Sequence, residues 1–266
     1  MTDYDYDYDY IVMGGTGLVG SSFVSELSSS GAKVLSLTSQ NFDLYCSKNI
    51  SSKFFINANG NSYRYKANKN PFWDFDKSVY SLIKSLKCFT SKKYIYFSSV
   101  DVYDDKRSPD NNQESAIINP RNLDYYGYNK FVAENILEKY HENCLVLRLG
   151  SVVSALAKKG PFYDLSQNQL YIDKNSKLSI IDIENIHKAF FVLERNNMSN
   201  QTFNLTGTGS VSIKYVVEKY NIDVAFRGSS ETAGLSSYDI STKKLSEIVE
   251  LESSIEIADK FFNSIK

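Results

Sequence analysis

The stretch YIVMGGTGLVG, residues 10–20, decides the fold class of this 266-residue chain. An apolar run ends in paired glycines, and an amphipathic segment from 18 to about 29 follows. Glycines at G-x-G-x-x-G spacing allow a tight turn and a close approach to a pyrophosphate, for which a following helix supplies free N–H groups. The stretch therefore predicts a dinucleotide-binding turn. The residues expected to bind the cofactor there are Gly14, Gly15, Thr16, Gly17, Leu18, Val19 and Gly20.

Strand-like and helix-like segments alternate along the rest of the chain. Such alternation with apolar strands is typical of a parallel sheet covered on both faces. We therefore expect an α/β fold, a Rossmann-type doubly wound parallel sheet with a small C-terminal α/β substrate lobe. The predicted strands are 10–15, 32–38, 53–58, 93–100, 144–150, 202–207 and 223–228, and the predicted helices are 18–29, 72–90, 125–141, 183–195, 213–220 and 253–263.

This pattern also predicts how the chain is divided. Residues 1–160, with a return segment at about 183–207, are expected to form the dinucleotide-binding core. Residues of about 161–182 and 208–266 are expected to form the substrate-binding lobe. The opening DYDYDYDY lacks the glycine and glutamate of a calcium loop, so we expect a frayed leader that runs into the first strand.

The composition limits the classes of binding partner and the cellular compartment that we expect for this protein. The net charge of -1 gives no electrostatic footprint for nucleic acid or an anionic membrane. No apolar run approaches the roughly 20 residues of a membrane span, and no secretory signal is recognisable at the N-terminus. Cys88 and Cys144 lie in apolar segments, which favours reduced core thiols, and neither histidine has a second ligand at metal-binding spacing. We expect a cytoplasmic protein that binds a small molecule and no metal.

The segment DYYGYNK, residues 124–130, contains the candidate acid–base pair. Tyr126 and Lys130 are four residues apart and therefore share a helix face. Four Tyr-x-x-x-Lys pairs occur in the chain, where composition alone supplies about two. Only this pair follows a glycine turn and a strand that ends in serines, Ser98 and Ser99, in the right order, at the start of the next helix. A nearby ammonium would lower the pKa of the Tyr126 phenol toward the working range.

The preference between NAD and NADP stays open. The acidic residue expected about 20 residues after the glycine turn, which would hold the adenosine ribose, is absent. The second strand ends instead in Thr38, Ser39 and Gln40. Hydroxyls suit a 2′-phosphate, which favours NADP slightly.

These motifs resemble the extended short-chain dehydrogenase/reductase family, in particular its NAD-dependent epimerase/dehydratase group, which modifies nucleotide sugars. INPRNLDYYGYNKFVAE (118–134) is similar to the P…YG.SK…AE pattern of that family, and INANG (56–60) to the turn under its cofactor. The resemblance implies a catalytic hydroxyl at Ser99, an acid/base at Tyr126, and an electrostatic partner and ribose ligand at Lys130. It also implies cofactor contacts at Thr38, Asp43, Leu44, Asn57 and Ala58.

The departures from the family pattern concern the substrate. Family dehydratases carry an Asp-Glu pair where this chain has Val100 and Asp101, so we do not expect dehydration. The arginines that clamp a nucleotide-sugar diphosphate are missing, and the asparagine usual near Ser78 is absent. Arg227 remains a candidate phosphate ligand, and the alternatives are Lys158, Lys159 and Lys177. Ser99, Val100, Asp101 and Arg227 are the residues expected to contact substrate.

Two classes of function remain. The first is an NAD(P)-dependent oxidoreductase or epimerase that acts on a sugar or nucleotide-sugar carbinol or ketone, with the keto-sugar reductase and the epimerase not separated. The second is a non-catalytic dinucleotide-binding regulator or scaffold. The resemblance also implies a homodimer through the helices 72–90 and 125–141, although burial against the sheet explains the apolar stripe on 72–90 equally well.

Overall fold

The computed structural model describes residues 5–227 and 235–265, which fall into two compact units. The first unit comprises residues up to 104, 118–147 and 197–202, and the second comprises 105–117, 148–196 and 203 onward. The predicted core also includes 105–117, 148–160, 183–196 and 203–207, which fall in the second unit. The functional division into a cofactor core and a substrate lobe stays a prediction.

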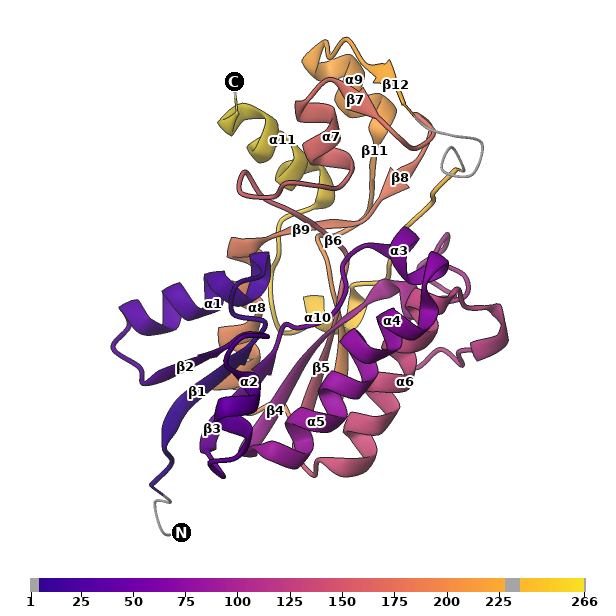
Figure 1. The fold of residues 1–266 in the computed structure, drawn as a ribbon. Helices are drawn as coiled ribbons and strands as arrows, with labels where there is room; N and C mark the ends of the chain where they lie inside the picture. The colour runs from indigo at the N-terminus through magenta and orange to yellow at the C-terminus, as the bar shows by residue number, and fades with distance from the viewer. Residues whose placement is uncertain (1–4, 228–234, 266) are drawn as a thin grey trace. The chain divides into compact units, whose positions relative to one another are not determined.

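A six-stranded sheet organises the chain, in the order β10-β5-β4-β3-β1-β2 (Figure 1). Strand β1 pairs in parallel with both β2 and β3, and β3 pairs in parallel with β4. The order therefore reverses at β1 and β3, as in a doubly wound fold, and the predicted fold class is confirmed. The strands are β1 (Tyr8–Met13), β2 (Val34–Leu37), β3 (Ser51–Asn57), β4 (Thr90–Ser99), β5 (Cys144–Leu149) and β10 (Gln201–Leu205).

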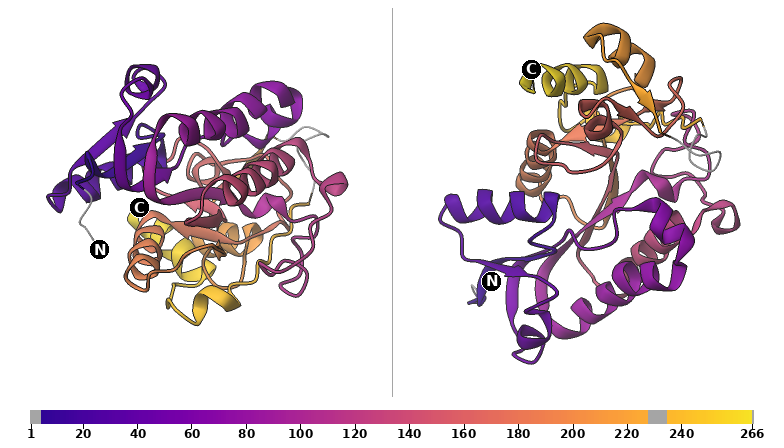
Figure 2. Two further views of the ribbon diagram at one scale, coloured as in Figure 1. Left: turned by 90° about the horizontal axis from the view of Figure 1, so that it is seen from below. Right: turned by 45° about the horizontal axis from the view of Figure 1, so that its top comes forward.

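Alternation along β4 sends its side chains to two different helix layers. Tyr94 and Tyr96 belong to the core cluster that includes residues of α5 (Ser81–Cys88) and α6 (Tyr125–Tyr140). Phe97 instead packs on Phe23 of α1 (Leu18–Ser29), with ring centroids 5.5 Å apart. Because side chains alternate along a strand, Tyr96 faces the helix that carries Tyr126 and Lys130. Helices α5 and α6 lie side by side in all three views (Figures 1 and 2).

The predicted helix at 72–90 is split into three helical pieces. Helix α4 (Pro71–Phe75) runs into a π-helical turn η1 (Asp76–Tyr80), and α5 follows. Val79 and Leu82 are buried, whereas Phe72 is 85% exposed and Tyr80 is 48% exposed. Part of the apolar stripe therefore packs against the sheet, and part of it is exposed at the surface. Two short helices, α2 (Phe42–Cys46) and α3 (Arg64–Lys69), were not expected.

The second unit contains three small two-stranded sheets and its own apolar core, which includes Ile180, Ile213 and Phe262. Among the described residues, strand β8 pairs with β11, β7 with β12, and β6 with β9. Its remaining elements are β6 (Ser151–Val153), α7 (Pro161–Ser166), β7 (Gln169–Leu170), β8 (Lys177–Leu178), β9 (Ile180–Asp182), α8 (Ile183–Arg195), β11 (Val211–Ser212), α9 (Ile213–Tyr220), β12 (Ala225–Phe226), α10 (Lys243–Ser246) and α11 (Ser254–Ser264).

The N-terminal Asp-Tyr repeat enters the sheet earlier than expected. The Asp7 carboxylate accepts a hydrogen bond from the Ser51 N–H at 2.8 Å, and Asp9 forms an ion pair with Lys53 at 2.9 Å. The prediction of a frayed leader is therefore wrong for these residues, while residues 1–4 lie outside the described chain. No helix within 5–227 or 235–265 has the length and apolar content needed to cross a bilayer.

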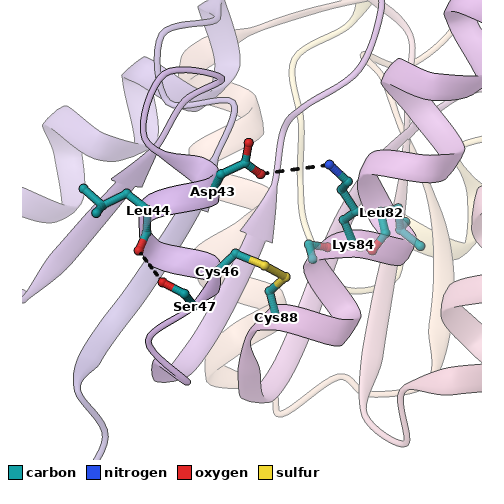
Figure 3. The surroundings of a disulfide bond; sticks show 8 residues. Asp43, Leu44, Cys46, Ser47, Leu82, Lys84 and Cys88 are labelled. Atoms are coloured by element: carbon teal, nitrogen blue, oxygen red, sulfur yellow. Dashed lines mark hydrogen bonds and ion pairs between the residues drawn. A yellow bond between two sulfur atoms is a disulfide. The ribbon is translucent and has the colours of Figure 1, made fainter.

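The expectation of a reduced Cys88 is wrong, because Cys88 forms a disulfide with Cys46 (Figure 3). The ends of α2 and α5 bring the two Cα atoms to 4.7 Å, a proximity that their separation of 42 residues hides in the sequence. Cys144 is buried and free, as expected. Disulfides are rare in the cytosol, so this bond weighs against the cytoplasmic location, which stays a prediction.

Reduction of the disulfide should lower stability. Closing a loop of this size stabilises a folded chain by about 2–4 kcal/mol. We expect a reductant to lower the free energy of unfolding of the wild type by about that amount, and to leave Cys46→Ser unchanged. Thiol titration of the unfolded, unreduced wild type should find one reactive cysteine, with Cys144→Ser as the control that has none. Three reactive cysteines in the wild type would contradict the bond.

Candidate active site

The glycine turn is closed by backbone packing that excludes side chains. A Cβ on Gly20 would lie 2.2 Å from the Gly14 carbonyl oxygen, and one on Gly14, whose φ is +84°, would lie 2.8 Å from Ala58. Helix α1 then begins after Gly17 with no side-chain cap and no acidic residue in its first turn. Its N-terminal N–H groups are therefore left for an anionic ligand. This cradle fits the pyrophosphate of a dinucleotide.

The turn after β3 lies against the glycine turn and is held from within. The Asn57 side-chain amide donates to the Tyr94 hydroxyl at 2.8 Å, and its oxygen accepts from the Asn59 N–H at 3.0 Å. The Ala58 N–H donates to the Met13 carbonyl at 2.9 Å. Asn57 and Ala58 thus lie beside the glycine turn, and the Asn57 side chain shapes the turn after β3. Their contacts with a cofactor stay predictions.

The residues predicted beside the adenosine follow β2. The Thr38 N–H donates to the Asn41 side-chain oxygen at 2.8 Å, so Thr38 builds the turn into α2. On α2 the Asp43 side chain is 89% exposed, and its carboxylate lies 4.0 Å from the ammonium of Lys84 on α5 (Figure 3). Leu44 is 60% exposed. Their contacts with a cofactor stay predictions.

Helix α6 approaches the end of β4 because Gly127 has no side chain. A Cβ there would lie 2.2 Å from the carbonyl oxygen of Asp101, in the 3₁₀ turn η2 (Val100–Val102). Asp124 caps the helix and accepts from the Gly127 N–H at 2.8 Å. This contact places Tyr126, in the first turn of α6, beside Ser99, the last residue of β4.

The Ser99 hydroxyl lies close enough to the phenol of Tyr126 to influence its ionisation. Burial and the Asp101 carboxylate raise the pKa of the Tyr126 phenol, and the polar Ser99 side chain offsets part of that effect. The Ser99 hydroxyl also accepts from the Asp101 N–H at 3.1 Å and donates to its carboxylate at 3.3 Å. This environment keeps the phenol protonated. The sequence predicted the opposite, a pKa of Tyr126 lowered by the Lys130 ammonium.

Lys130 lies on the same face of α6 and is only 5% exposed. Its ammonium donates to the Phe97 carbonyl at 3.2 Å and lies 5.1 Å from the centre of the Tyr96 ring. Burial lowers the pKa of Lys130 to about 8, against Asp74 and Glu134, which raise it. A Cβ on Gly60, whose φ is +135°, would lie 3.2 Å from this ammonium. The cation therefore lies against the turn after β3.

A layer of buried polar groups surrounds Lys130. Asp74 of α4 is fully buried and accepts a hydrogen bond from the Asn129 side chain at 2.7 Å. Its other carboxylate oxygen and the hydroxyls of Ser78 and Tyr96 have no protein partner among the described residues. Ser78 stands near the position of the family's asparagine, in the π-helical turn η1. Such turns are frequent at functional sites.

The first unit thus brings together most of the predicted site. Ser99, Tyr126 and Lys130 lie at one end of the sheet, with the buried Val100 and the carboxylate of Asp101 beside them. Arg227 is exposed, follows β12 in the second unit, and stays a prediction as a phosphate ligand. Sequence reasoning missed Arg64, Asp74, Asp124 and Glu134. Of these, Asp124 alone had a readable signal, because an Asp just before a helix is a typical cap.

The comparisons with known proteins assign the family. Residues 10–166 match the model of the NAD dependent epimerase/dehydratase family, and the chain belongs to that family. No curated protein matches the chain. The chain resembles UDP-glucose 4-epimerase of Thermotoga maritima, solved with UDP-glucose, at 15% identity and TM-score 0.74 over 96% of this chain and 98% of that one.

Two other solved structures cover the chain equally well. One is RMD of Pseudomonas aeruginosa complexed with NADPH, at 16% identity and TM-score 0.74 over 96% of this chain and 99% of that one. Another is a mutant of UDP-glucuronic acid 4-epimerase of Bacillus cereus, solved with a fluorinated UDP-glucuronic acid and NAD, at 14% identity and TM-score 0.77 over 96% and 98%. At these identities the likeness concerns the fold.

The contact of Gly127 with Asp101 generates a test. Gly127→Ala should lower the free energy of unfolding by about 1–3 kcal/mol, because the helix must shift away from backbone atoms that cannot rotate aside. The exposed Asn135→Ala on the same helix, the matched control, should change it by less than about 0.5 kcal/mol. Chemical denaturation of both variants measures the difference. Equal stabilities would show that the contact is not tight.

Proposed function

We propose that this chain is an NAD(P)-dependent oxidoreductase that acts on a sugar or nucleotide-sugar carbinol or ketone. The observation that carries the proposal is the placement of Ser99, Tyr126 and the buried ammonium of Lys130 together at the end of β4. Tyr126 exchanges the proton of the substrate oxygen, and Ser99 hydrogen-bonds that oxygen. Lys130, charged below about pH 8, stabilises negative charge on the phenol and binds the cofactor ribose. A bound dinucleotide supplies the hydride chemistry at its nicotinamide.

Within this proposal, reduction of a ketone is favoured over epimerisation. Burial and Asp101 raise the pKa of Tyr126, so the phenol is a proton donor at neutral pH. A donor is what a carbonyl oxygen requires as it becomes a hydroxyl. The absence of an acidic ribose ligand after β2 points the same way, since it suits a 2′-phosphate and therefore NADPH. The family resemblance also includes the epimerases, which remain the alternative within this class.

A non-catalytic dinucleotide-binding regulator or scaffold is the alternative from another class. The missing diphosphate-clamping arginines favour it. Against it stands the shaping of the protein around the acid–base pair, because Gly127 and Asp124 set Tyr126 beside Ser99, and two buried carboxylates accompany Lys130. Burying charged groups costs free energy unless they are paired. A protein that only binds a dinucleotide would not need these buried charges.

A homodimer is also proposed, in keeping with the expectation from the resemblance. On the α4–α5 segment, Phe72 and Tyr80 are 85% and 48% exposed, and on α6 Tyr125 and Tyr128 are 55% and 41% exposed. Helices α5 and α6 lie side by side (Figures 1 and 2). Exposed aromatic side chains gathered on adjacent helices are typical of an interface between subunits.

Tyr126→Phe should reduce turnover by 10²-fold or more, the usual scale for a general acid, and leave dinucleotide affinity nearly unchanged. The ring is kept, so the fold and the cofactor cradle are undisturbed. Steady-state rates and a binding titration measure the two quantities, with the exposed Tyr128→Phe as the control. Unchanged turnover in Tyr126→Phe would overturn the catalytic assignment and favour the scaffold.

Incubation with NADPH or NADH and a panel of nucleotide-linked keto-sugars and simple sugars should show NADPH consumption with a keto-sugar. A reductase releases its cofactor at each turnover, so the purified protein should lack dinucleotide absorbance. Tightly held dinucleotide together with interconversion of sugar epimers would instead identify an epimerase. Consumption with simple sugars only would remove the nucleotide from the proposal.

A further inference from the structure

One guanidinium joins the two segments that carry the acid–base groups. Arg64, in the first turn of α3, forms an ion pair and hydrogen bond with the Asp124 cap of α6. Its NH1 atom also lies 3.7 Å from the carboxylate of Asp101, just beyond Ser99. The Arg64 side chain is 44% exposed, whereas those of Asp101 and Asp124 are 15% and 22% exposed. The cation thus covers two nearly buried carboxylates from the solvent side.

The surroundings of Tyr126 contain more negative than positive charge. The carboxylates of Asp101, Asp74 and Asp124 all raise the pKa of its phenol, after burial, which is the largest cause. The Arg64 guanidinium opposes burial and holds the pKa of Asp124 below its usual range. Other charged groups lie on α6 or on elements that pack against it. They include Lys130 and Glu134 on α6, the exposed Lys66 and Lys69 on α3, the exposed Asp76 and Lys77 on η1, and the exposed Lys87 and half-exposed Lys84 on α5, while the Tyr96 phenol lies on β4.

We propose that Arg64 is a positioning residue for the acid–base chemistry: it fastens Asp101 and Asp124 together, and so sets both the Ser99–Tyr126 geometry and the charge felt by the phenol. This inference rests on the proposed function of Tyr126. Arg64 acts through the two carboxylates and not on substrate. A planar guanidinium can bind two carboxylates at once with separate N–H groups, which an ammonium does less well.

Charge changes at this bridge should move the pH dependence of kcat/KM in opposite directions. Arg64→Met removes the positive charge, disfavours the phenolate, and should move the midpoint assigned to Tyr126 to higher pH by roughly one pH unit. Asp101→Asn removes a negative charge and should move it to lower pH by a similar amount. The double variant should return toward the wild type, and Arg64→Lys should stay near it. Arg107→Met breaks an exposed pair with Asp105 in the second unit and should move nothing.

A second readout does not depend on turnover. In protein labelled with 3-fluorotyrosine, the ¹⁹F resonance missing from Tyr126→Phe reports the ionisation of this phenol directly. Opposite shifts of that titration in Arg64→Met and Asp101→Asn support the inference, even if no tested substrate reacts and the proposed function fails. Equal titrations in all folded variants overturn it, even if the enzyme is active. Slower turnover without a shift in either readout would make Arg64 merely structural and overturn it too.

Discussion

The approach of helix α6 to the end of strand β4 is the constraint on which the site depends. Gly127 permits it, because its Cα lies where any side chain would strike the Asp101 backbone. The Asp124 cap fixes the start of the helix, and Tyr126 follows two residues later. A helix held farther away would leave Ser99 and Tyr126 in place along the sequence but would separate their hydroxyls. The proposed catalytic geometry is therefore a consequence of backbone packing.

Beneath this contact the protein buries charge. Lys130 is surrounded by Tyr96, Asp74 and Glu134, and burial lowers the pKa of its ammonium to about 8. The nearby carboxylates partly restore the charged state. The same carboxylate-rich surroundings favour the neutral phenol at Tyr126. Arg64 balances the outer carboxylates of this group.

Sequence patterns predicted the features that depend on hydrophobic periodicity and on the order of motifs along the chain. Helices α1, α8 and α9 were predicted within their observed bounds, because each has an apolar stripe and a clear terminus. Helix α3 was missed, since among its six residues Ala67 alone is buried and no stripe forms. The Cys46–Cys88 disulfide and the ion pair of Arg64 with Asp124 join residues 42 and 60 positions apart. No local pattern encodes such contacts, because the packing of whole elements creates them.

The candidate site divides in the same way. Motifs in the expected order predicted Ser99, Tyr126 and Lys130 as site residues. The raised pKa of Tyr126 could not be read from the motif, because it arises from burial and from the Asp101 carboxylate. A crystal structure of the chain with its dinucleotide tests the central claim most directly. The account predicts the hydroxyls of Ser99 and Tyr126 facing the reactive carbon of the nicotinamide, with the Lys130 ammonium on the ribose. A nicotinamide bound away from Tyr126, or a crevice filled by protein side chains, would contradict it.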